Sequence, residues 1–69
     1  MMSQAQKIAE KRRITYDQFA GKMRAKGIKS EITTQKIWYG MYNEEKEDVY
    51  LSTLRVAAEI LGVPVKELL

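Results

Sequence analysis

The sequence contains no cysteine and no histidine, and it has one proline and four glycines. Disulfides and zinc sites built on thiolate or imidazole ligands are therefore excluded. The absence of histidine also removes the side chain that most often acts as a general acid or base near neutral pH, which excludes histidine-based catalytic triads. We expect no enzymatic activity, no metal and no cofactor.

No stretch of the chain approaches the roughly 18 apolar residues of a membrane-spanning helix, and no apolar leader follows Met1. We therefore expect a cytoplasmic protein without membrane association. The chain has room for a single domain, residues 1–69. A domain of this size buries only about 60% of the surface that its unfolded chain exposes, which favours self-association as a source of further burial.

Charge is divided unevenly along the chain. Residues 1–36 carry nine basic and three acidic side chains, a net charge of +6, whereas residues 37–69 carry three basic and six acidic ones, a net charge of −3. Lysine and arginine side chains that neutralise phosphates release condensed counterions, so the first half is the candidate surface for a polyanion. A solvated basic face on small helices is the alternative that the charge pattern leaves open.

A first helix is predicted over residues 2–12. Ala5, Ile8 and Ala9 recur there at helical spacing, and strong helix formers lie between them. This segment is therefore expected to present one apolar face to a core.

The second predicted helix has the clearest local pattern in the sequence. Thr15 and Gln18 have the spacing of a capping box, in which each side chain bonds the backbone amide of the other residue. Asp17 lies in the first turn, where the helix dipole favours an anion, and Gly27 is suited to end a helix. These features predict a helix over residues 16–26.

A third helix is predicted over residues 34–42, with Thr33 as its N-cap. Ile37 and Met41 are one turn apart and are expected on its buried side. Gly40 falls inside this helix, where glycine costs about 1 kcal/mol relative to alanine.

Residues 43–48 are a polar, mostly acidic loop, and Asp48 is the expected N-cap of a fourth helix. The apolar face expected of this helix consists of Leu51, Leu54, Ala57, Ala58 and Leu61. Gly62 is suited to end it, and Pro64 to begin a short final turn over residues 65–68. The chain as a whole is predicted to be all-α.

Two capped helices separated by a turn have the sequence form of a helix-turn-helix, which we place at about residues 15–42. In that motif the second helix enters the major groove of DNA with its N-terminal residues at the base edges, while the first helix crosses the backbone. The pattern favours double-stranded DNA as the partner.

Two segments of the chain follow the patterns of one known family: ITYDQFAGKM is similar to lsqeeLAekl, and LSTLRVAAEILGVPVKELL is similar to psletLlklAkaLgvsldeLl. On these segments the chain resembles the Cro-like, phage-repressor (XRE) family of helix-turn-helix proteins. The resemblance implies a compact, lambda-repressor-like bundle of four to five helices that binds double-stranded DNA in a sequence-specific manner. It also implies a small, repressor-like transcriptional regulator of a phage, plasmid or integrative element, associated with the bacterial nucleoid when bound.

The middle of the chain departs from the family pattern. A tight Gly-Val-Ser turn is usual in the family, whereas residues 23–32 make a longer connection. Aligning Ile32 and Thr33 with Val-Ser reproduces the five-residue step to the buried Ile37. The Glu-x-Gly that usually closes the helix is missing, and Gly40 falls where a buried isoleucine is common. On this alignment the resemblance implies base contacts by Thr34, Gln35, Lys36 and Tyr39.

The chemistry of these positions suits base contact independently of the resemblance. Glutamine can bond adenine at N6 and N7, lysine prefers guanine or a phosphate, and the threonine methyl group can contact the thymine methyl group. A solvated helix face is the alternative. Phosphate contacts are expected from Thr33, Arg12, Arg13, Lys22, Arg24, Lys26 and Lys29.

Trp38, Tyr39 and Tyr42 give the third helix an unusual aromatic density. Because Ile37 and Met41 are expected to fill its inward face, one or two aromatic rings should remain partly exposed. Three roles remain open for Trp38: packing beneath the long turn, contact with nucleic acid, or a dimer contact.

A homodimer on DNA is expected, because one helix-turn-helix reads too few base pairs to discriminate among the competing sites of a genome. The C-terminal turn has more apolar side chains than we expect it to bury, and the expected dimer contact consists of Val63, Val65, Leu68 and Leu69. The rival hypothesis is a protein-interaction module on the same fold, which would use its aromatic surface to inhibit or anchor a partner protein without binding DNA.

Overall fold

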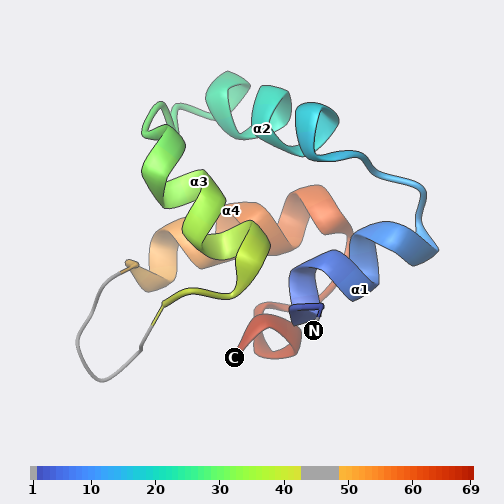
Figure 1. Cartoon of the computed structure of the whole chain (residues 1–69). Helices are drawn as coiled ribbons and strands as arrows, with labels where there is room; N and C mark the ends of the chain where they lie inside the picture. The colour runs from blue at the N-terminus through green and yellow to red at the C-terminus, as the bar shows by residue number, and fades with distance from the viewer. Residues whose placement is uncertain (1, 43–48) are drawn as a thin grey trace.

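Capping groups and apolar spacing divide the chain into short helices in the computed structural model, which describes residues 2–42 and 49–69. These residues form four α-helices and one short 3₁₀-helix, with no strand among them (Figure 1). The elements are α1 (Gln4–Lys11), α2 (Tyr16–Ala25), α3 (Glu31–Tyr39), α4 (Leu51–Leu61) and η2 (Val65–Leu68). The all-α prediction is confirmed. Over the described residues, no helix combines the length and apolarity needed to cross a bilayer.

Capping boxes begin both α1 and α2. The Gln18 amide donates to the Thr15 hydroxyl at 3.2 Å, and the Thr15 amide donates to the Gln18 side-chain oxygen at 3.0 Å, as the sequence predicts. Ser3 and Gln6 make the same reciprocal pair at α1, with distances of 3.0 and 2.9 Å. Since Ser3 is the cap, α1 begins two residues later than predicted.

The helices pack around one core to which all five elements contribute. α2 contacts both α3 and α4, while α1 contacts α3, α4 and η2. Figure 1 shows α2 lying across the top of the molecule and the two ends of the chain side by side below α4. This arrangement leaves the side of α3 that faces away from α1 and α2 open to solvent.

The α4 prediction is confirmed for four of the five residues of its apolar face and for the end of the helix. Its buried side chains are Leu54, Ala57, Ala58 and Leu61. Gly62 ends the helix with φ of 75°, the left-handed conformation that glycine adopts readily. Leu51 was expected on the buried face but is 47% exposed, because the inward stripe starts one turn later. Tyr50 occupies the N-cap without a side-chain hydrogen bond. The acidic loop and the predicted cap Asp48 lie outside the described residues.

Trp38 is buried, with 9% of its surface exposed. Its ring packs edge-to-face with that of Tyr16 at a centroid distance of 5.5 Å and is tilted against Phe19 at 5.3 Å. Such aromatic pairs contribute about 0.5–1.5 kcal/mol beyond the burial of their area. Of the three roles left open for Trp38, the structure therefore supports packing in the core, where Trp38 lies against α2.

The predicted end of the third helix is wrong. Gly40 is not inside α3 but terminates it, with φ of 68°. The Met41 amide then bonds the Lys36 carbonyl at 2.8 Å, which turns the chain away from the helix axis. Met41 consequently leaves the inward face and is 69% exposed, so the expectation that it is buried is also wrong.

The C-terminal turn lies where it was predicted, but one of its apolar side chains is more deeply buried than expected. η2 spans Val65–Leu68 after Pro64. Leu68 is only 3% exposed and belongs to the core, and its carbonyl accepts a hydrogen bond from the Tyr42 hydroxyl. Because Leu68 is buried in its own chain, it is not available for the expected dimer contact. Val63 and Val65 are partly buried against the core, and Leu69 is 59% exposed.

Replacing Leu61 with alanine should lower the free energy of unfolding by about 2–5 kcal/mol, because Leu61 is fully buried and the substitution leaves a cavity. Leu51→Ala is the matched control in the same helix and should cost less than about 1 kcal/mol. Urea unfolding followed by circular dichroism measures both. Equal losses for the two variants would contradict this assignment of the core.

Candidate nucleic-acid interface

The N-terminus of α3 differs from the predicted one and shifts the candidate site. Ser30 is the N-cap: its side chain accepts a hydrogen bond from the Thr33 amide at 3.2 Å. Glu31 follows in the first turn, where the helix dipole favours its charge. The prediction that Thr33 caps this helix is therefore wrong. Thr33 is the third residue of the helix, and the helix begins three residues earlier than expected.

Thr34 faces the core instead of the solvent. It is 2% exposed, and its hydroxyl donates to the Ser30 carbonyl at 3.1 Å. This local bond satisfies a buried polar group that would otherwise be destabilising. Thr34 shares the inward face with Ile37 and Trp38. Its burial removes Thr34 from the candidate base contacts.

The outward face of α3 carries the remaining candidates. Helical spacing of about 100° per residue places Ile32, Gln35, Lys36 and Tyr39 opposite the buried residues. Gln35 is exposed and Lys36 is partly exposed. Tyr39 is 52% exposed, as expected for one of the three aromatic residues. We call these four residues the outward face.

Sequence reasoning missed Ile32 as a surface residue. The prediction placed it in the turn before the helix, as a counterpart of the family's valine. In the structure it is the second residue of α3 and is 68% exposed. The Ser30-Glu31 pair could have indicated this start, because a serine followed by an acidic residue is typical of a helix N-terminus.

Five residues, 26–30, connect α2 to α3. Gly27 has φ of 94°, a conformation that a side chain would strain. The Ile28 amide bonds the Met23 carbonyl at 2.9 Å, and the Ile28 side chain packs against the core. These contacts fix the end of α2, so Lys29 is held at the surface next to the first turn of α3.

All six candidate arginine and lysine residues outside α3 are exposed, but they lie in two groups. Arg12 and Arg13 precede α2, and the Arg12 guanidinium lies against the end of α4, where a Cβ on Gly62 would be 2.8 Å from Nη1. The second group lies on the last half of α2 and in the following turn and consists of Lys22, Arg24, Lys26 and Lys29. Lys29 of the second group immediately precedes Ser30, the N-cap of α3, whereas Lys22 and Lys26 line a hollow with Glu59 and Ile60 of α4.

Lys26 differs from the rest of its group because it is already paired. Its Nζ lies 3.0 Å from Oε1 of Glu59 on α4. Both side chains are largely exposed, at 45% and 65%, so the pair contributes at most about 1 kcal/mol to stability. It nevertheless reduces the positive charge that Lys26 offers to an anion.

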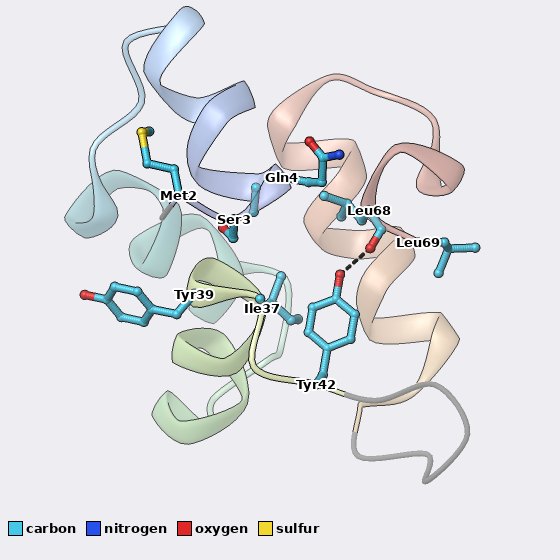
Figure 2. Close-up of a pocket in the computed structure, with 10 residues that line it drawn as sticks. Met2, Ser3, Gln4, Ile37, Tyr39, Tyr42, Leu68 and Leu69 are labelled. Atoms are coloured by element: carbon cyan, nitrogen blue, oxygen red, sulfur yellow. Dashed lines mark hydrogen bonds between the residues drawn. The ribbon is translucent and has the colours of Figure 1, made fainter.

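A shallow hollow of about 320 Å³ lies between the first turn of α1, the end of α3 and η2 (Figure 2). Tyr42 reaches across it to the Leu68 carbonyl. No carboxylate, lysine or arginine side chain is among the described residues that line it. The hollow therefore offers apolar surface and hydroxyl groups but no paired acid and base.

Comparisons with known proteins give no match: no family model, no curated protein sequence and no solved structure is similar to the chain. The interpretation of the site therefore rests on this chain's own residues. The outward face of α3 and the adjacent basic group are the features that bear most directly on function.

Ser30→Ala should lower the free energy of unfolding by about 1 kcal/mol, because it removes the acceptor for the Thr33 amide. Thr33→Ala is the matched control. It removes no cap, so its effect should stay within about 0.5 kcal/mol. Chemical unfolding measures both variants, and a larger loss for Thr33→Ala would restore Thr33 as the cap.

Proposed function

We propose that the protein binds double-stranded DNA in a sequence-specific manner and acts as a small, repressor-like transcriptional regulator. The observation that carries the proposal is the outward face of α3: Trp38 packs the opposite side of this helix against α2, and a basic group lies on α2 and in the turn before α3. In a helix-turn-helix, the second helix lies in the major groove and the first crosses the backbone. We assign these roles to α3 and α2.

The family resemblance supports this assignment better in the observed register than in the predicted one. Gly27 and Ile28 take the place of the family's Gly-Val, and Ser30 takes the place of its capping serine, with Lys29 as one additional residue. Gly40 then closes the helix, where the family has Glu-x-Gly. The lambda-repressor-like fold, and the phage, plasmid or integrative-element setting, are proposed on this resemblance.

Each part of the surface has a chemistry that suits duplex DNA. Gln35 can bond N6 and N7 of adenine through its amide, and Lys36 can bond O6 and N7 of guanine or a phosphate. Lys22, Arg24 and Lys29 are exposed on α2 and in the turn that leads to α3, and they suit phosphate contacts, which fix the position of the protein without discriminating between sequences. The hydroxyl and ring of Tyr39 extend the same face at its far end.

A protein-interaction module is the second candidate. It is favoured by the exposure of Tyr39 and Met41, at 52% and 69%, at the end of α3 beside the hollow. Burial of that apolar surface would not depend steeply on salt. Phosphate contacts would, because each one releases counterions and gives a linear fall of log affinity with log salt concentration. A salt series with random duplex DNA therefore separates the two functions.

Gln35→Ala should weaken binding to the preferred duplex by about 1–3 kcal/mol and binding to random duplexes very little. Lys29→Ala should weaken both equally and reduce the salt slope by about one unit. Lys26→Ala should have a smaller effect than Lys29→Ala, because Lys26 is already paired with Glu59. Fluorescence anisotropy with a duplex selected from a random library measures all three. Equal losses on both duplexes for Gln35→Ala would contradict base contact by this residue.

We further propose that the protein occupies DNA as a two-fold dimer. With Leu68 buried, Leu69 is the exposed member of the expected contact, beside the partly buried Val63 and Val65. Footprinting should show inverted half-sites about 34–36 Å apart along the duplex. A single asymmetric half-site at saturating protein, with one chain bound per duplex, would contradict the dimer.

A further inference from the structure

Ile32 is the most unusual residue of the outward face, because it is apolar and 68% exposed at the start of a helix. Basic and polar side chains surround it: Lys29 precedes it, and Gln35 and Lys36 follow one turn later. Single exposed apolar residues are common on protein surfaces, so exposure alone implies nothing. The position of Ile32 in the proposed interface is what makes it informative.

Building on the proposed function, we propose that Ile32 contacts the C5 methyl group of a thymine and is a specificity-determining residue. The first turn of α3 is the part of the helix that approaches the base edges. Ile32 is the second residue of that turn and points away from the buried Thr34 and Trp38. Its side chain is therefore placed to meet the floor of the major groove.

The chemistry of the base edges leaves thymine as the fitting partner. In the major groove, guanine, cytosine and adenine present hydrogen-bond donors and acceptors, whereas thymine also presents a methyl group. Isoleucine has neither a donor nor an acceptor in its side chain. Packed on any other base edge, it would bury polar groups without partners, which costs free energy. A β-branched side chain in a helix also has one strongly preferred rotamer, so little freedom is lost on contact.

Gln35, the neighbour of Ile32 on the outward face, further restricts the DNA sequence that we expect the protein to prefer. Residues three apart on a helix lie about 5–6 Å from each other, which brings Gln35 within reach of the same or the next base pair. Glutamine favours adenine, so Ile32 and Gln35 together favour A·T pairs at adjacent positions. Tyr39 lies seven residues further along, about 10 Å away, with Gln35 and Lys36 between. Ile32 is thus separated from the apolar surface at the other end of α3.

The test removes single methyl groups from the DNA. A duplex selected from a random library is resynthesised with uracil in place of thymine, one position at a time, which keeps the base pairing and deletes only the methyl group. Affinity should fall about fourfold at one position of each half-site, the effect of about 0.8 kcal/mol for a methyl-sized apolar group. In Ile32→Ala this sensitivity should disappear at that position, while the effects of Gln35→Ala persist.

Leu51→Ala is the matched control, because Leu51 is also an exposed aliphatic residue in the first turn of a helix, at 47% exposure. It should keep the full sensitivity to uracil. Thermal unfolding of Ile32→Ala should match that of the unaltered protein, which shows that the fold is retained.

Two results would overturn the inference and leave DNA binding intact: equal affinity for thymine and uracil at every position of a selected duplex, or undiminished uracil sensitivity in Ile32→Ala. The absence of salt-dependent binding to any duplex would instead refute the proposed function, and the role of Ile32 would fall with it. Loss of affinity for a protein ligand in Ile32→Ala, without any duplex binding, would assign the residue to a protein contact.

Discussion

The packing of Trp38 between two rings of α2 is the contact on which the arrangement of α3 depends. Tyr16 and Phe19 lie one turn apart on α2, and both meet the same indole. With Trp38 in this position, α3 cannot rotate about its axis without losing ring contacts, so its inward and outward faces are fixed together. The exposure of Gln35 and Ile32 follows from the burial of a residue on the opposite side of the same helix.

Patterns confined to a few consecutive residues were predictable from the sequence, because their physical cause is local. The Thr15–Gln18 capping box needs only its own four residues, and the periodic face from Leu54 to Leu61 needs only one helix. The capping box of Ser3 and Gln6 has the same local form and could have been found in the same way. The all-α fold followed from such patterns.

The start of α3 could not be fixed by the same reasoning, because two residues three apart, Ser30 and Thr33, are both suitable caps. The choice between them does not follow from these two residues alone: in the structure Ser30 is the cap, so Glu31 and Ile32 belong to the first turn of α3. Three of the four predicted base-contact residues, Gln35, Lys36 and Tyr39, still lie on the outward face. Thr34, a predicted base contact, is buried, whereas Ile32, predicted to lie in the turn before the helix, is exposed on α3.

Ser3 and Leu68 hold the two ends of the chain at the same end of α3. The Ser3 hydroxyl donates to the Trp38 carbonyl, and the Leu68 carbonyl accepts from Tyr42. Gly40 lies so close to Ser3 that a Cβ there would be 2.9 Å from the serine Cβ. Because Leu68 belongs to the core, the core is incomplete until the last turn of η2 has packed in place. A chain that ended before η2 would lose the Tyr42–Leu68 hydrogen bond, so the end of α3 would keep its contact with the N-terminal segment and lose its contact with the C-terminal one.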